Sequence, residues 1–307
     1  MYARRVVGLN PWLPWPLCRS AWWTEPVRAE RLAALRIGVA AVLLLDVLGT
    51  YLPQAHDFFG ANSLGSPDVF ASVRIASRWS LLTGIANPFW MQGVLLVWAG
   101  AAACLLVGLL PNLSAAVAWV LSVSVMGLNY YLHNSGDNVR TIELFYLMLC
   151  PCGAAWSLSG RGQSFGKRVY VAAWPVRLLL VQLVIIYFVN GVYKLAGSSW
   201  RDGDVLHTVL SNLAWTRFSY SQLGLPELLL RLLTWTTLLW EVSFPLLVLS
   251  PRTRAFALCL GVFFHVGTGV LLRLTMFPLY MLCLYLPLVP WERGVDAWRD
   301  RQDRRAW

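Results

Sequence analysis

Long apolar runs, broken by Pro, Gly, Asn or charged residues, recur along the whole chain of 307 residues. Each is long enough to cross a hydrocarbon layer of about 30 Å at about 1.5 Å per helical residue. They lack the residue-by-residue alternation of a membrane barrel, so helices must satisfy the backbone. We predict an all-α polytopic transmembrane bundle of about eight spans, near residues 31–53, 89–110, 113–133, 139–157, 172–196, 228–250, 253–272 and 275–290.

Composition supports an integral membrane protein. The chain is 58% hydrophobic and 13% charged, with a mean hydropathy of +0.57, outside the usual balance of a soluble globular domain. The net charge of +10 does not indicate nucleic-acid binding, because the basic residues flank apolar spans and leave no soluble domain to carry a groove.

The distribution of Lys and Arg predicts the orientation. Fifteen of these residues lie in one set of loops and the two termini, against four in the opposite loops, namely Arg74, Arg78, Arg201 and Arg217. Positive loops stay on the cytoplasmic side. We therefore expect both termini in the cytoplasm, in a bacterial inner or plasma membrane.

Three regions follow from this pattern. Residues 1–30, rich in Trp and Pro among basic residues, are predicted to lie at the membrane interface on the cytoplasmic side. Residues 31–290 form the transmembrane domain, and 291–307 form a basic cytoplasmic tail. The long outer loops are expected to hold short interfacial helices, one of them at Val205–Leu213.

The stretch Gln182–Asp204 is the strongest candidate for a site. Tyr187, Asn190 and Lys194 are spaced i, i+3 and i+7, so they share one helix face. An ammonium in a membrane helix costs on the order of 3 kcal/mol, which makes Lys194 a functional-site hypothesis. The alternative is a lysine at the helix end whose head group reaches water.

Polar residues also gather between the third and fourth spans, at Asn129, His133, Asn134, Asp137, Asn138, Arg140 and Glu143. Gly136 is expected to break the helix and Asp137 to cap the next one, with Arg140 paired to a carboxylate three residues away. Neither His133 nor Asn134 is needed as a cap in this interpretation. Both lie at the same outer level as Lys194, which makes them site candidates.

Two further polar residues fall inside later spans. Glu241 follows Thr234 and Thr237 at helical spacing, which predicts a polar face turned toward protein. His265 shares a face with Gly261, where a neighbouring helix can approach closely. A lone histidine there is commonly a packing residue, and a Glu241–His265 pair would be either a structural clasp or a proton relay.

The cysteines give no separate chemistry. Cys150-Pro151-Cys152 has the wrong spacing for a redox-active Cys-x-x-Cys helix, so packing is the preferred interpretation over thiol chemistry. No metal site is predicted.

Several segments together resemble a known family. The pattern around the lysine consists of Tyr187-Phe188, Gly191, Lys194-Leu195, Trp200 and Gly203. The segments RLAALRIGVAAVLLLD, GDNVRTIELFYLMLCPCGAAWSLS, LLWEVSFPLLVL and GVFFHVG follow in the same order as in that family. Over most of 31–290 the chain resembles the HTTM family, the membrane domain of vitamin K-dependent gamma-carboxylases.

The resemblance implies a role for the lysine. In the carboxylases the matching lysine is the base that deprotonates vitamin K hydroquinone, and a nearby Asn-His pair would fall in reversed order at His133 and Asn134. Removing water from around Lys194 favours a neutral amine that can take a proton.

Carboxylases continue into a large lumenal domain, whereas this chain stops soon after its last span, so glutamate carboxylation is not expected. We expect instead lyase or oxidoreductase chemistry on a lipid quinone or hydroquinone, with the bilayer and a peptide or protein substrate as further partners. Lys194, His133 and Asn134 would be catalytic. The supporting residues would be Tyr187, Asn190, Glu241, His265, Trp200, Asp137 and Arg140.

The competing hypothesis is a non-catalytic membrane partner in the maturation or export of a peptide. The two differ in whether a closed apolar pocket, with polar groups converging on it, lies beside Lys194. We expect that pocket between spans three, five, six and seven.

Overall fold

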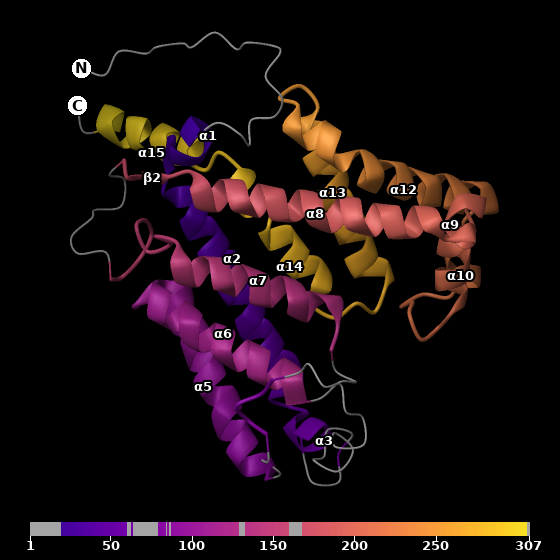
Figure 1. The fold of residues 1–307 in the computed structure, drawn as a ribbon, viewed down its shortest axis with the longest axis horizontal. Helices are drawn as coiled ribbons and strands as arrows, with labels where there is room; N and C mark the ends of the chain where they lie inside the picture. The colour runs from indigo at the N-terminus through magenta and orange to yellow at the C-terminus, as the bar shows by residue number, and fades with distance from the viewer. Residues whose placement is uncertain are drawn as a thin grey trace.

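The fold is an assembly of helices with one short β-ribbon (Figure 1). The computed structural model describes residues 20–59, 63, 79–83, 85, 87–128, 133–159 and 168–305. The expected all-α membrane bundle is confirmed. Most of the long outer loop 53–88 and the first nineteen residues of the interfacial segment 1–30 lie outside the described residues.

Six of the described helices are long and apolar enough to cross a membrane. They are α2 (Glu30–Asp46, continued by the π-helix η2, Val47–Tyr51), α5 (Pro88–Val107), α6 (Pro111–Leu128), α8 (Trp174–Ala196), α12 (Glu227–Leu249) and α13 (Arg254–Leu271). Each coincides with a predicted span to within a few residues. Apolar runs bounded by Pro, Gly or charge therefore located these elements correctly.

The other two predicted spans are shorter than expected. α7 covers Ser135–Leu149, where residues 139–157 were predicted, and Cys150 is already extended because Pro151 follows it. The last span consists of α14 (Phe277–Cys283) and the 3-10 turn η4 (Leu286–Leu288). Both α7 and α14 pack against each other and against α2, so short helices fill the interior of the bundle.

The remaining described helices are short or peripheral. They are α1 (Ser20–Thr24), α3 (Ala55–Phe59), α9 (Ser198–Asp202), α10 (Val205–Ser211), α11 (Tyr220–Leu223) and α15 (Glu292–Arg305). The predicted helix at Val205–Leu213 corresponds to α10, which packs against α12.

A two-stranded antiparallel ribbon joins the start of the chain to the segment before α8. β1 (Pro26–Arg28) pairs with β2 (Tyr170–Ala172), and Arg28 lies opposite Tyr170. This ribbon was not predicted from the sequence, because strands of three residues are too short to show a periodic pattern.

The tail folds back onto the beginning of α2. Arg31 donates to Glu292 at 2.6 Å, and Arg28 donates to Asp296 at 3.2 Å, both carboxylates belonging to α15. In Figure 1 α15 and α1 lie together at the end of the molecule where both termini are drawn. The basic tail is therefore partly helical and attached to the bundle.

Arg36, in α2, forms hydrogen bonds with two other segments, the end of α5 and residues 152–156. Its buried guanidinium donates to the carbonyls of Leu105 at 2.6 Å and Leu106 at 2.8 Å, in the last turn of α5, where helical carbonyls lack partners. It also donates to the carbonyls of Cys152, at 3.1 Å, and Trp156. One arginine thus satisfies backbone groups from two regions that are far apart in the sequence.

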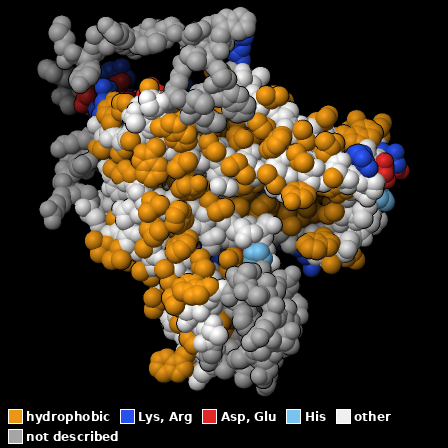
Figure 2. All heavy atoms as spheres, in the orientation of Figure 1, with side chains coloured by type: hydrophobic (Ala, Val, Ile, Leu, Met, Phe, Trp, Pro, Cys, Tyr) orange, Lys and Arg blue, Asp and Glu red, His pale blue; other side chains and the backbone are white. Residues whose placement is uncertain are grey.

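The exterior is largely apolar. Hydrophobic side chains spread over most of the visible face in Figure 2, and single residues such as Phe263 and Leu246 expose 76% and 74% of their surface. Apolar surface of this extent is unusual on a soluble monomer. Together with the six long apolar helices, it supports an integral membrane protein.

Candidate functional site

Lys194 forms an ion pair with Glu241. The ammonium nitrogen Nζ lies 2.5 Å from Oε1 and 2.6 Å from Oε2, so one cation contacts both carboxylate oxygens. The side chain of Glu241 is 3% exposed and that of Lys194 is 21% exposed. The charged groups are therefore largely removed from the surface, and each is compensated by the other.

Gly191 explains how the two helices bring this pair together. A Cβ at position 191 would lie 2.8 Å from the backbone nitrogen of Val242 and 3.0 Å from the carbonyl carbon of Glu241. Any side chain there would force α8 away from α12. The glycine sits nearly one turn before Lys194, so the closest approach of the helices falls beside the ion pair.

Aromatic rings complete the surroundings of the ammonium. Nζ of Lys194 lies 4.8 Å from the ring centroid of Trp200, in α9, and 5.7 Å from that of Phe264, in α13. Both distances are suitable for cation–π attraction. The lysine therefore does not extend freely into water, and the motif residues Gly191, Lys194 and Trp200 act at one place.

A cavity of about 350 Å³ lies beside the ion pair. Its walls come from α7, α8, α12, α13 and α14 and from Ser135, Asn138, Val139, Ile142, Ile186, Tyr187, Asn190, Lys194, Glu241, Phe264, His265, Phe277 and Met281. Apolar side chains form most of the wall, and polar groups from α7, α8, α12 and α13 also contribute to it. The hollow is partly open, whereas a closed pocket was the observation expected to separate the two functional hypotheses.

The expected position of the cavity needs one correction. We predicted walls from spans three, five, six and seven, but α6, the third span, supplies no lining residue. The first turns of α7 take its place through Ser135 and Asn138, because the helix already begins at Ser135 and its polar first turn faces the cavity.

A chain of three hydrogen-bonding groups borders the cavity. The Tyr187 hydroxyl lies 2.6 Å from Nε2 of His265 and 2.5 Å from the hydroxyl of Tyr285. Nδ1 of His265 is buried and has no partner among the described residues. The considered Glu241–His265 pair does not form, because Lys194 occupies both carboxylate oxygens and Tyr187 occupies the histidine.

Tyr285 is a site residue that the sequence analysis missed. It lies between α14 and η4, in a segment without clear periodicity. Gly261 was the available signal, since a Cβ there would lie 2.0 Å from the Tyr285 hydroxyl. The glycine beside His265 was interpreted as a place for close helix approach, and it is the hydroxyl of Tyr285 that uses the space.

The predicted helix start near Asp137 was wrong. Asn134 is the N-cap of α7: its Oδ1 accepts from the backbone nitrogen of Gly136 at 2.7 Å. Asp137 returns the bond by accepting from the backbone nitrogen of Asn134 at 2.9 Å, which is the reciprocal arrangement of a capping box. Gly136 is inside the first turn, so Asn134 has the structural role that we had assigned to Asp137.

His133 lies at the edge of the site. Its Nε2 is 3.1 Å from Oδ1 of Asn138, and Asn138 lines the cavity whereas His133 does not. Asn190, also a candidate, does line the cavity, and its amide donates to the carbonyl of Ile186 at 2.7 Å. Of the three proposed catalytic residues, only Lys194 reaches the cavity.

Arg140 and Asp137 belong to a different cluster. The Arg140 side chain is fully buried and lies 3.1 Å from Asp46 and 2.9 Å from Asp137. Tyr280 donates to Asp46 at 3.1 Å, and Tyr51 donates to Asp137 at 3.2 Å. None of these five residues lines the cavity beside Lys194.

The two neighbouring cysteines pack inside the protein. Cys150 and Cys152 are 1% and 0% exposed, and the thiol of Cys152 lies 3.3 Å from the carbonyl of Leu147. Their burial agrees with the packing role preferred from the sequence.

A family model of the HTTM domain matches residues 24–290, and no solved structure matches the chain. The HTTM domain is the membrane domain of vitamin K-dependent carboxylase-type proteins. The match covers the ion pair, the cavity and every long helix described above. On this evidence the chain belongs to the HTTM domain family.

Proposed function

We propose that this protein is a membrane enzyme that binds a lipid hydroquinone, or a similar ring carrying an acidic hydroxyl, in the cavity beside Lys194. The observation that supports the proposal most directly is an ion pair placed on the wall of an apolar cavity of about 350 Å³. Cavities of this size, mostly apolar with a few convergent polar groups, are typical binding sites for small molecules.

The lining suits a flat ring. Phe264 and Phe277 contribute aromatic surface, while Val139, Ile142 and Met281 contribute aliphatic surface. Lys194, Glu241, His265 and Asn190 add charged and hydrogen-bonding groups to the same lining. A ring that carries a hydroxyl would find both kinds of contact in this cavity.

The ion pair can move a proton internally without a change of charge, and its later uptake of a proton from a ligand gives the pair one positive charge, which the negative charge left on the ligand balances. As drawn, the ammonium of Lys194 contacts both oxygens of Glu241, and transfer of one proton along that contact gives a neutral amine and a neutral carboxylic acid. The amine can then accept a proton from an acidic hydroxyl in the cavity. Lys194 becomes cationic again beside the new negative charge, which it stabilises.

A hydroquinone would supply both that acidic hydroxyl and the reducing electrons for a reaction with oxygen. The protein's own task is to bind the ring, exclude water and hold the proton. His265 and Tyr187 both line the cavity, so a second hydroxyl of the ring would lie near them.

Binding of a hydroquinone tests the proposal. The purified protein in lipid nanodiscs would be titrated with naphthohydroquinone and benzohydroquinone analogues, and binding followed by quenching of tryptophan fluorescence. Lys194→Ala should weaken binding and abolish proton uptake. Tyr193→Ala is the matched control, because the neighbouring Tyr193 is 76% exposed and does not line the cavity.

Two outcomes contradict the proposal. Binding that is equal in wild type and Lys194→Ala would remove the lysine from the site. Absence of binding to every quinone tested, with a correctly folded protein, would favour the alternative of a non-catalytic partner in peptide maturation or export.

The orientation is proposed together with the function. We place both termini in the cytoplasm, in a bacterial inner or plasma membrane, because Lys and Arg are concentrated in the loops on the side of the termini. The Lys194 end of α8 would then lie near the outer leaflet. Labelling of single cysteines by an impermeant reagent, introduced at Ser211 and at Arg305, would test this arrangement; labelling of the second in intact cells would contradict it.

A further inference from the structure

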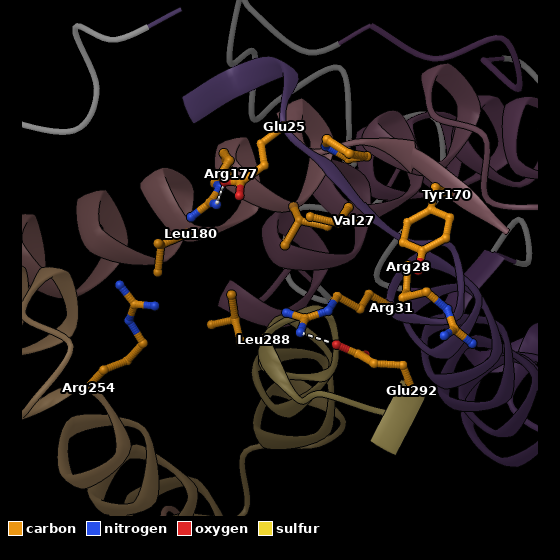
Figure 3. A pocket seen from close by; sticks show the side chains of 12 residues that line it. Glu25, Val27, Arg28, Arg31, Tyr170, Arg177, Leu180, Arg254, Leu288 and Glu292 are labelled. Atoms are coloured by element: carbon orange, nitrogen blue, oxygen red, sulfur yellow. Dashed lines mark hydrogen bonds and ion pairs between the residues drawn. The ribbon is translucent and has the colours of Figure 1, made fainter. Parts of the chain in front are cut away.

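A second cavity lies at the other end of α8. It has a volume of about 380 Å³ and is lined by β1, β2 and parts of α2, α8, α13, η4 and α15 (Figure 3). Arg177, on its wall, precedes Lys194 by 17 residues in the same helix, or about 26 Å along the axis. The two cavities are therefore separate sites.

Four arginines line this cavity, which we call the arginine pocket: Arg28, Arg31, Arg177 and Arg254. Figure 3 shows the guanidinium group of Arg28 directed away from the other three. It is held by Glu30 at 2.5 Å and by Asp296 at 3.2 Å. Arg28 is thus neutralised by its own partners and forms part of the frame.

The other three arginines extend toward the interior of the pocket (Figure 3). Arg31 forms an ion pair with Glu292 at 2.6 Å. Among the described carboxylates, Glu25 is the one within ion-pair distance of Arg177, at 3.6 Å, and the side chain of Glu25 is 66% exposed. The ion pair of Arg177 and Glu25 is weak, because it is long and water surrounds the carboxylate.

Arg254 has no carboxylate within ion-pair distance in the described part of the chain. Its Nε donates to the carbonyl of Val248 at 2.8 Å, which fixes the side chain and leaves the two terminal nitrogens available. Arg254 and Arg31 both repel the charge of Arg177. Three like charges from α2, α8 and α13 are thus held around one hollow with incomplete compensation.

The pocket also has an apolar side. Val27, Val176, Leu180 and Leu288 form part of its lining. Trp22 stacks on Arg177 with the guanidinium carbon 4.6 Å from the ring centroid, and tryptophan commonly lies at the level of lipid headgroups. Because α8 and α13 both begin here, their N-terminal dipole ends add to the positive potential.

We propose that the arginine pocket binds the phosphate group of an anionic phosphoester, with Arg177 and Arg254 as its principal ligands. Planar guanidinium groups bind phosphate oxygens through paired hydrogen bonds, and two such groups with unused donors face the same space. The apolar side and the adjoining membrane helices favour a phospholipid as the source, whose acyl chains would follow Val176 and Leu180 into the bilayer. Basic pockets between membrane helices bind such headgroups in other proteins.

Lipid retention is the direct test. The full-length protein would be purified from membranes containing equal amounts of phosphatidylglycerol and phosphatidylcholine, and retained lipids measured by native mass spectrometry. The double variant Arg177→Gln/Arg254→Gln should lose affinity for phosphatidylglycerol by about thirtyfold. Arg252→Gln is the matched control, because Arg252 is exposed and outside the pocket.

A parallel titration with glycerol phosphate, followed by thermal shift, separates the two sources of the same group. Stabilisation by the soluble ester that is lost in the double variant supports a phosphate site filled from solution. Equal retention of phosphatidylglycerol and phosphatidylcholine by wild type, without response to glycerol phosphate, overturns the proposal. If the double variant does not fold, the wild-type comparison still decides, and Arg254→Lys should weaken binding without removing the charge.

Discussion

Two regions of this protein place a cation against buried carboxylates, and they differ in what surrounds the charges. Arg140 lies between Asp46 and Asp137, and its guanidinium carbon stacks 4.9 Å from the ring centroid of Trp98. Protein side chains cover this group completely. Lys194 and Glu241 form a closer pair, at 2.5 Å, but one side of it borders a cavity of about 350 Å³.

This difference in surroundings indicates that the Arg140 cluster has a structural role and the Lys194–Glu241 pair a chemical one. An ionised residue within a membrane helix suggests a functional site by default, and both clusters qualified on that basis. Only the cluster beside a cavity can receive a ligand. Arg140 and Asp137, which the sequence analysis placed among the supporting residues, are better explained as an internal clamp between α2 and α7 that also engages Tyr280 of α14.

Replacing Arg140 should have the largest effect on stability. Arg140→Met leaves Asp46 and Asp137 buried without their cation, which typically costs about 3–5 kcal/mol. Thermal unfolding in detergent would measure the loss, with Arg231→Met as control, because Arg231 pairs at a partly exposed position with Glu227 and Asp204. A variant as stable as wild type would show that the clamp is not needed.

Glu241→Gln should show the opposite pattern, with a large loss of turnover and a smaller loss of stability. The substitution keeps the shape of the side chain but removes the proton acceptor for Lys194, so turnover should fall on the order of a hundredfold. Stability should change less than in Arg140→Met, because the side chain of Lys194 is 21% exposed and can reorient toward water. Turnover and unfolding temperature measured on the same preparation would decide, and a collapse of stability with activity would erase the distinction between the two regions.

Tyr285→Phe tests the hydrogen-bonded groups that border the cavity beside Lys194. The variant removes one hydrogen bond from the Tyr187 hydroxyl and keeps the bond to His265, so stability should fall by about 1 kcal/mol. If the hydrogen-bonded groups of His265, Tyr187 and Tyr285 conduct a proton, the ratio of the reaction rates in H₂O and D₂O should also change. Tyr193→Phe, at an exposed position outside the cavity, should leave both unchanged.

Breaking the ion pair of Arg31 and Glu292 should have the smallest effect on stability. It serves as a reference for the Arg140 cluster and for the Lys194–Glu241 pair. Burial alone would raise the pKa of Glu292, but the hydrogen bond from Arg31 and the charge of Arg28 hold that pKa below its usual value. The pair therefore contributes stability above the pKa of the unfolded chain, near 4.5, and the contribution is lost as the pH falls through the lowered value.

Glu292→Gln should remove this dependence and cost roughly 0.2–1 kcal/mol, as partly exposed pairs do. Unfolding temperatures at pH 3.5 and pH 7 would test it. A larger loss at the lower pH than at pH 7 contradicts the assignment.

The long helices were predictable because hydrophobic length alone defines a membrane span. Their boundaries at Pro88, Pro111 and Glu227 follow from residues that begin or interrupt a helix. The ends of α7 and α14 were less predictable, since apolar residues continue past Leu149 and Cys283 while the helical backbone does not. Pro151 accounts for the end of α7, because it directly follows the extended Cys150.

The contact partners of the site residues were harder to predict than the helix faces on which the residues lie. The spacing of Tyr187, Asn190 and Lys194 correctly indicated one side of α8, and all three line the cavity. Periodicity cannot tell which helix lies opposite, so the contact from Lys194 to Glu241 and that from Tyr187 to Tyr285 required the tertiary structure. The same reason explains why Asp46 was noticed without its partner Arg140.

The bonds made by Arg36 have a consequence for biogenesis. When α2 leaves the ribosome, the carbonyls that later accept from this arginine, at Leu105 and Cys152, have not been synthesised. A lone α2 in lipid would carry one unsatisfied guanidinium, at about 3 kcal/mol. Completion of these bonds must therefore wait until roughly half of the polypeptide has been made, and the bonds then favour association of α2 with α5 and with the segment that contains Cys152.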